Sequence, residues 1–318
     1  VELAARKWNL APEEILVCST GIIGHPLPME KIEGAISQIE LSRGPQTDEN
    51  TARAFMTTDT VPKFFAARTK IGQDFVTVGG QTKGVGMIGP DLQALHANAP
   101  HANALHATML AFLTTDAQIE APRLQKLLER AVQKSFNSVT VDGDTSTNDT
   151  AILLASGASG VEISNENEAQ FLEVLEFVAR ELAKKIARDG EGATKLIEIS
   201  VSGAQTEADA KKIALTIANS PLVKTAIFGR DPNWGRIAMA AGRAGVAFES
   251  RDLSFSLGEV ELFRGGEPVP FDLPTAQAQL AGENVQISLQ LRGGNASWTA
   301  WTCDFSYDYV KINAEYHT

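Results

Sequence analysis

The stretch NENEAQFLEVLEFVARELAKKIARDGEGATKLIEISVSGA, residues 165–204, carries a helical pattern followed by a strand pattern. In its first part, apolar residues recur at the spacing of one helix face, namely Phe171, Leu172, Leu175, Val178, Ala179, Leu182 and Ile186. Cations gather at the end of this part and Gly190 follows, which are signals of a helix C-terminus. Residues 195–204 then alternate apolar and polar side chains. The stretch therefore predicts a long helix followed by a strand.

Similar patterns lie on both sides of this stretch. Residues 121–136 and 206–220 have helical spacing, whereas residues 15–20 (ILVCST) resemble a short buried strand and residues 138–144 alternate like a strand. From Gly245 onward, including residues 298–316, the pattern is mostly strand and turn. This succession predicts a layered α/β (α+β) fold.

The bulk composition narrows the function classes. A net charge of −11 with a pI near 5.0 argues against a nucleic acid or an anionic membrane surface as partner. Cys18 and Cys303 are too few for a disulfide framework in 318 residues, so both are expected to be reduced thiols in a cytosol-like compartment. No apolar run reaches the roughly 18 residues of a membrane span, and no signal peptide is recognised. The first residue is Val1 and not methionine, which suggests a trimmed chain.

Three local motifs suggest ligand sites that their surroundings do not support. GVGMIG (84–89) fits a dinucleotide loop, but the tract after it is a poor helix. DGDTSTND (142–149) resembles the start of a calcium loop, yet Thr147 and Leu153 occupy the required Gly and Glu positions, so an Asx-rich turn is expected. His96, His101 and His106 are five residues apart, which does not place them on one helix face. No metal site is predicted.

The junction Ala107–Thr108, in ALHATMLAFLTTDA (104–117), suggests nucleophilic chemistry. A threonine hydroxyl is a weak nucleophile until a base takes its proton, and cleavage before Thr108 would make its own α-amine that base. The turn STGIIG (19–24) has the small residues that suit an oxyanion hole.

Eight motifs together resemble the ornithine acetyltransferase family, also called glutamate N-acetyltransferase, of arginine biosynthesis. They occur in the family's order and cover essentially the whole chain: CSTGIIGHPLPMEKI, MTTDTVPK, KGVGMIGPD, ATMLAFLTTDA, VTVDGDTSTNDT, RDGEGATK, SPLVKTAIFGRDPNWGRI and TCDFSYDYVKINAEYHT. The resemblance implies a layered sandwich with β-sheets packed between helices, in a self-cleaving acyltransferase with an N-terminal threonine.

The resemblance also implies roles for individual residues. Thr108 matches the nucleophile, the bond between Ala107 and Thr108 matches the cleavage site, and Thr20 and Gly21 match the oxyanion hole. The matches to substrate-binding positions are Thr57, Lys83, Thr108, Glu191, Asn313 and Thr318. Cleavage would divide the chain into residues 1–107, the C-terminal part of an α subunit, and residues 108–318, a β subunit.

The implied reaction is a ping-pong acetyl transfer from N2-acetylornithine to glutamate, without a metal or organic cofactor. Whether acetyl-CoA also serves as acetyl donor is left open. The family's mature form implies a heterotetramer of two α and two β fragments, in the cytoplasm or, in a eukaryote, in the mitochondrial matrix.

The chain departs from the family pattern at two places. A family N-terminal region ahead of Val1 is absent, and residues 92–106 are an insertion where the family has a single residue. Two alternatives therefore stay open: an uncleaved non-catalytic homologue, and a related self-cleaving aminopeptidase or amidase.

Overall fold

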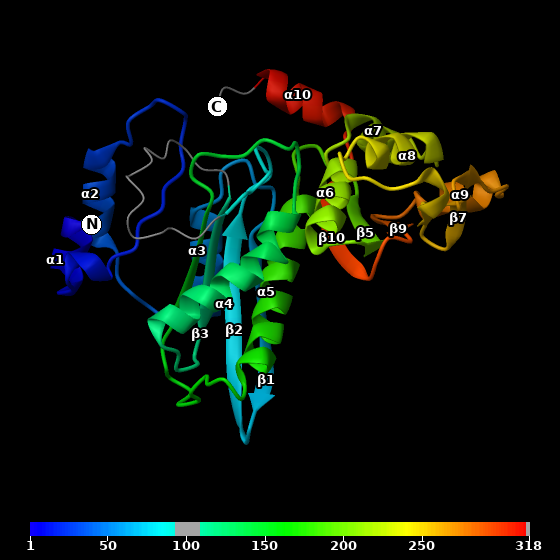
Figure 1. Cartoon of the computed structure of the whole chain (residues 1–318). Coiled ribbons are helices and arrows are strands. Elements are labelled where there is room, and N and C mark those ends of the chain that lie inside the picture. The colour runs from blue at the N-terminus through cyan, green and yellow to red at the C-terminus, as the bar shows by residue number, and fades with distance from the viewer. Residues whose placement is uncertain (93–108, 316–318) are drawn as a thin grey trace.

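The computed structural model describes residues 1–92 and 109–315, which form two β-sheets and their covering helices (Figure 1). The helices are α1 (Glu2–Trp8), α2 (Met29–Gln38), α3 (Pro45–Ala54), α4 (Ala121–Gln133), α5 (Glu168–Arg188), α6 (Glu207–Ala218), α7 (Pro221–Phe228), α8 (Trp234–Gly242), α9 (Leu273–Gln279) and α10 (Tyr307–Glu315). The strands are β1 (Lys63–Ile71), β2 (Asp74–Lys83), β3 (Leu110–Thr115), β4 (Thr150–Ala155), β5 (Leu196–Ala204), β6 (Ser254–Leu257), β7 (Val260–Arg264), β8 (Glu267–Pro268), β9 (Asn284–Gln290) and β10 (Ala296–Cys303). Short 3-10 helices cover Pro12–Glu14, Phe136–Ser138 and Ser250–Asp252.

The first sheet has the order β1-β2-β3-β4, in which the pairs β1–β2 and β2–β3 are antiparallel and the pair β3–β4 is parallel. Its register aligns Lys83 of β2 with Leu110 of β3, and Leu110 with Thr150 of β4. The C-terminal end of β2 therefore lies beside the N-terminal starts of β3 and β4. This row of three strand ends positions the site described below.

Helix α5 forms the centre of the first core. Its apolar face is fully buried and packs on β1 and β2, with further contacts to β10 of the second sheet. Figure 1 shows α4 and α5 side by side against the first sheet, with α5 running along β1 and β2. The one-sided apolar spacing in the sequence explains this placement, because burying that face removes it from water.

The second sheet has the order β10-β5-β9-β6-β7-β8, and α6 packs on β10 and β5. The helices next to it begin at side-chain caps: Thr206 accepts the Asp209 N–H, Ser220 the Val223 N–H, and Asn233 the Arg236 N–H. A separate apolar core fills the space between these helices and the sheet.

The predicted layered α/β fold is confirmed, and so are the helices at 121–136, 165–190 and 206–220 and the strand at 195–204. Both cysteines are free, as expected. Within the two described ranges, no helix is both long and apolar enough to cross a bilayer.

The predicted strand at residues 15–20 is wrong, because this segment pairs with no other strand and its Leu16 and Val17 side chains are exposed. Apolar, β-branched residues favour a strand only where a partner strand pairs with them. Residues 138–144 also form no strand, although Val139 and Val141 are buried together with Ser138 and Thr140. Their backbone makes single contacts instead, a bridge from Val139 to Trp301 and a 2.8 Å bond from the Val141 N–H to the Ile88 carbonyl.

The prediction of strand and turn through residue 316 is wrong at its end, since residues 307–315 form helix α10. The helix starts where Ser306 Oγ accepts the Asp308 N–H at 3.1 Å, the contact of a helix N-cap. None of its residues is buried, so no apolar periodicity marks it in the sequence.

Candidate functional site

Lys83, the last residue of β2, is the centre of a cluster of hydroxyl groups. Its side chain is 1% exposed, and Nζ donates to Thr20 Oγ1 at 3.1 Å and to Thr57 Oγ1 at 3.3 Å. Burial lowers the pKa of Lys83 to about 8, helped by the Lys63 cation and opposed by the Asp59 and Asp149 carboxylates. Because an ammonium only donates, each hydroxyl oxygen accepts and directs its own hydrogen away from Lys83.

Glu191 marks a second cluster, one loop away. Its backbone N–H donates to the Val85 carbonyl at 2.8 Å, which ties the loop after α5 to the loop after β2. Its carboxylate accepts from Thr58 Oγ1 at 3.3 Å and from Asn313 Nδ2 of α10 at 3.0 Å. The carboxylate lies directly on Gly86, where a Cβ would come within 2.4 Å of Oε2.

A buried ion network lies between the two clusters. Lys63 Nζ is 2.6 Å from Asp59 Oδ1 and 2.5 Å from Asp189 Oδ2, and the lysine side chain is 1% exposed. Asp189 also accepts the Thr60 N–H at 3.0 Å and the Thr60 hydroxyl. The network thereby joins the start of β1 to the residue after α5.

Asp59 extends this network to the Lys83 cluster. Its Oδ1 accepts the Gly84 N–H at 2.8 Å and its Oδ2 accepts the Thr57 N–H at 3.1 Å. Burial by itself would raise the pKa of Asp59, but the Lys63 ammonium and these N–H donors lower it overall. The carboxylate is thus held ionised, and it fixes the backbone beside both Thr57 and Lys83.

The loop DGDTSTND (142–149) holds the chain on both sides of residues 93–108. Asp142 accepts the Met87 and Ile88 N–H groups at 2.6 and 2.9 Å, and Asp149 Oδ1 accepts the Met109 N–H at 3.0 Å. Asn148 Nδ2 donates to the Ser19 carbonyl at 3.2 Å, which places the STG turn on the same loop. The Asx-rich turn predicted here is therefore also part of the site.

The structure brings together Thr20, Thr57 and Lys83 in one cluster and Glu191 and Asn313 in the next. Gly21 follows Thr20 in the chain and is exposed. Asn313 Nδ2 donates to Glu191 and, at 3.0 Å, to the Tyr309 carbonyl, so its amide holds Glu191 in place. The remaining predicted site residues, Ala107, Thr108 and Thr318, lie outside the described residues. So do His96, His101 and His106 and all of the insertion 92–106 except Leu92.

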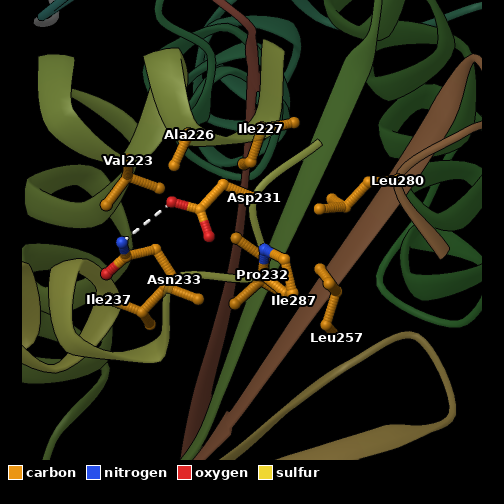
Figure 2. Close-up of a pocket in the computed structure, with 10 residues that line it drawn as sticks. All are labelled: Val223, Ala226, Ile227, Asp231, Pro232, Asn233, Ile237, Leu257, Leu280 and Ile287. Carbon is orange, nitrogen blue, oxygen red and sulfur yellow. Dashed lines mark hydrogen bonds between the residues drawn. The ribbon is translucent and has the colours of Figure 1, made fainter. Parts of the chain in front are cut away.

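Two hollows in the described part of the chain are lined by none of the residues of the Lys83 and Glu191 clusters. The one in Figure 2 is between α7, α8 and the second sheet, is lined mostly by apolar side chains such as Val223, Ile237 and Leu280, and has a volume of about 10 Å³. That volume holds at most one water molecule, so this hollow is a packing gap and no substrate site. A larger hollow of about 700 Å³ is lined by Lys63 and Asp189 on one side and by α10 on the other.

Within residues 1–92 and 109–315, no group of His, Cys, Asp and Glu side chains has the arrangement of a metal site. Sequence reasoning missed the Asp59–Lys63–Asp189 network and the position of Asp149. One signal was present for Lys63, which occupies an inward position in the alternating pattern of β1. A lysine at a buried strand position is rarely left without a carboxylate partner.

Comparison with known proteins gives concordant results. The model of the ArgJ family matches residues 1–318. The protein named arginine biosynthesis bifunctional protein ArgJ 1, from Nostoc sp., is 48% identical, over 100% of this chain and 76% of its own length. The chloroplastic protein of that name from Citrullus lanatus is 47% identical, over 98% of this chain and 67% of its own. The crystal structure of arginine biosynthesis bifunctional protein ArgJ from Bacillus halodurans is 43% identical, with a TM-score of 0.62 over 64% of this chain and 97% of its own.

Proposed function

This chain belongs to the ArgJ family of bifunctional acetyltransferases of arginine biosynthesis, and we propose that it moves an acetyl group from N2-acetylornithine to glutamate on Thr108. One observation carries the assignment to this site: Lys83, Thr20 and Thr57 meet within 3.3 Å at the strand end beside Met109, the residue after Thr108. In the second cluster, Thr58 and Asn313 donate hydrogen bonds to the Glu191 carboxylate.

The first stage is activation by cleavage. The Thr108 hydroxyl attacks the Ala107 carbonyl, and hydrolysis of the resulting ester frees the α-amine of Thr108. This divides the chain into residues 1–107 and 108–318. The two fragments would assemble as a heterotetramer, two copies of each.

The second stage is acetyl transfer. The free amine takes the Thr108 hydroxyl proton while Oγ attacks the acetyl carbonyl of N2-acetylornithine. The Thr20 hydroxyl and the Gly21 N–H stabilise the tetrahedral oxyanion, and loss of one such donor typically costs about 10²–10³-fold in rate. Ornithine leaves with the proton, and glutamate then accepts the acetyl group by the reverse steps. The cycle uses no metal or organic cofactor.

The observed charges suit the two amino-acid substrates. The Lys83 ammonium, with the Thr57 hydroxyl beside it, is a partner for the α-carboxylate that both substrates carry, and Thr318 belongs to the same proposed set. The Glu191 carboxylate, held by Asn313, is a partner for the side-chain ammonium of ornithine. The proposed location is the cytoplasm or, in a eukaryote, the mitochondrial matrix. The Citrullus lanatus relative is named as chloroplastic.

The test compares wild-type protein with Thr108→Ala and, as control, Thr114→Ala, an exposed threonine of the adjoining strand β3. Mass spectrometry should find two fragments in the wild type and the control, the second beginning at Thr108, and one intact chain in Thr108→Ala. Wild type mixed with N2-acetylornithine alone should release one equivalent of ornithine per site and hold the acetyl group on the 108–318 fragment.

Each alternative predicts a different result. Continuous release of ornithine without glutamate would indicate an amidase. An intact wild-type chain that neither binds nor releases acetyl would indicate a non-catalytic homologue. Acetyl transfer by Thr108→Ala would refute the proposed nucleophile. Substituting acetyl-CoA for N2-acetylornithine in the same assay decides whether it is a second donor.

A further inference from the structure

Glu191 is held differently from the two carboxylates of the neighbouring ion network. Asp59 and Asp189 lie 2.6 and 2.5 Å from the Lys63 ammonium, so a cation offsets their charge. Glu191 instead accepts from two neutral groups, the Thr58 hydroxyl at Oε1 and the Asn313 amide at Oε2, and among the described residues it has no ion-pair partner. Neutral donors orient a carboxylate without cancelling its charge, which points to a cationic ligand.

The Glu191 carboxylate keeps acceptor capacity on both oxygens. An ionised carboxylate has about four lone-pair sites, and Thr58 and Asn313 occupy one on each oxygen. On a further side the group lies directly on Gly86, where a Cβ would come within 2.4 Å of Oε2. An ammonium, which brings three donors, can therefore bind while both neutral donors stay in place.

Thr58 belongs to a strap, residues 57–60, whose backbone is fixed on both sides of it. The Thr57 N–H donates to Asp59 Oδ2 at 3.1 Å, and the Thr60 N–H donates to Asp189 Oδ2 at 3.0 Å. Both acceptors are carboxylates of the buried ion network. The Thr58 hydroxyl thus reaches Glu191 from a backbone that is held in advance, as precise positioning of a charged group requires.

The hydrogen bond from Thr58 to Glu191 is long. Its 3.3 Å exceeds the roughly 2.5–3.0 Å that is usual between two oxygens. Hydrogen bonds in a site without its ligand are often long and shorten in the complex. The length therefore suits a contact that is completed when the cation binds.

We propose that Thr58 is a positioning residue for substrate discrimination: its hydroxyl holds Glu191 Oε1 so that the carboxylate meets the side-chain ammonium of N2-acetylornithine and of ornithine. This inference rests on the proposed function. Glutamate carries a carboxylate in place of that ammonium and gains nothing from the contact. The strap thereby divides two tasks between neighbours. Thr57, beside Lys83, serves the α-carboxylate that both substrates share, and Thr58 serves the side chain in which they differ.

The test compares Thr58→Val with Thr58→Ser in the full chain. Valine keeps the shape of threonine without the hydroxyl, so Glu191 Oε1 loses its donor and the carboxylate turns toward water to regain one. KM for N2-acetylornithine and the calorimetric Kd for ornithine should rise about five- to tenfold, whereas both constants for glutamate should stay within about twofold of wild type. Thr58→Ser keeps the hydroxyl and should restore ornithine binding to within about twofold of wild type.

The matched control is Thr60→Val, the same change two residues further along the strap. The Thr60 hydroxyl donates to Asp189 and not to Glu191. This variant should lose thermal stability and keep the wild-type ratio of the Kd for ornithine to the Kd for glutamate.

The role of Thr58 is overturned if Thr58→Val binds ornithine as the wild type does, or if it weakens ornithine and glutamate equally. It is also overturned if Thr60→Val changes the ratio as much, or if Thr58→Ser binds ornithine as weakly as Thr58→Val. Failure of the proposed function looks different. A wild type that binds ornithine through Thr58 but transfers no acetyl group refutes the function and leaves the role of Thr58 standing. A wild type that binds neither ligand overturns both.

Discussion

Replacing Lys63 with methionine should be among the most destabilising single changes near the site. Methionine fills a similar volume but removes the ammonium that lies 2.6 Å from Asp59 and 2.5 Å from Asp189. The Asp59 side chain is 0% exposed and that of Asp189 7% exposed, so water cannot replace the lost cation. Breaking a buried ion pair on one side typically costs about 3–5 kcal/mol.

The loss should be measurable as a shift in thermal midpoint and should depend on pH. At roughly 2–4 °C per kcal/mol for large domains, the midpoint should fall by roughly 6–20 °C. In the wild type the lowered pKa of Asp59 adds stability above its unfolded pKa, and this is lost as pH falls through the lower folded value. Without Lys63, burial of Asp59 favours the protonated form of its carboxyl. The deficit should therefore be larger at about pH 7.5 than at about pH 4.5.

Thermal or urea unfolding at both pH values measures the effect, with Arg53→Met as the matched control. Arg53 pairs with Glu49 at the same spacing of four residues, but the two side chains are 58% and 41% exposed. Such a surface pair should contribute less than about 0.5 kcal/mol. A Lys63→Met protein within about 1 kcal/mol of the wild type, or equally destabilised at both pH values, would contradict the reasoning.

Three further predictions concern the site. Gly86→Ala should raise KM for N2-acetylornithine about tenfold or more, because the new Cβ would displace the flexible end of the Glu191 side chain. The thermal midpoint should change little. An unchanged KM in steady-state kinetics contradicts this prediction. Because the pKa of Lys83 is about 8, KM for glutamate should rise as pH passes about 8, and Lys83→Met should show a high KM without that dependence. Asp149 has a folded pKa of about 6, above its unfolded value, so its contribution favours folding at low pH and is lost as pH rises through about 6. Thermal melts should therefore show Asp149→Asn gaining about 2 kcal/mol of stability relative to wild type between about pH 4.5 and 7.5, and a loss of stability over that range refutes the raised pKa.

Local patterns predicted the fold where an element's burial is one-sided. Helix α5 and strand β5 match their predicted ranges because each shows its periodicity within its own residues. Residues 15–20 and α10 were predicted wrongly for complementary reasons. The first has strand-forming residues without a partner strand, and the second is a helix without a buried face.

The motifs predicted the polar residues of the site better than their connections. Lys83, Thr20 and Thr57 could be named from sequence and do meet in space. One of the two partners of Lys63, however, is Asp189, which lies 126 residues further along the chain. No local spacing encodes a contact of that separation, because it is made when β1 packs beside the end of α5.

The sequence by itself determined which chemical groups are available: a candidate nucleophile at Thr108, the lysine at position 83, and the periodic segments that become α5 and β5. Only the tertiary structure decided their neighbours. The register that aligns Lys83 with Leu110 and Leu110 with Thr150 sets three strand ends in one row. That row gives Asp149 the Met109 amide and leaves its second oxygen buried without a partner. Hydrogen bonds between strands fix such positions across long separations in the chain, whereas periodicity describes only the residues within one strand or helix.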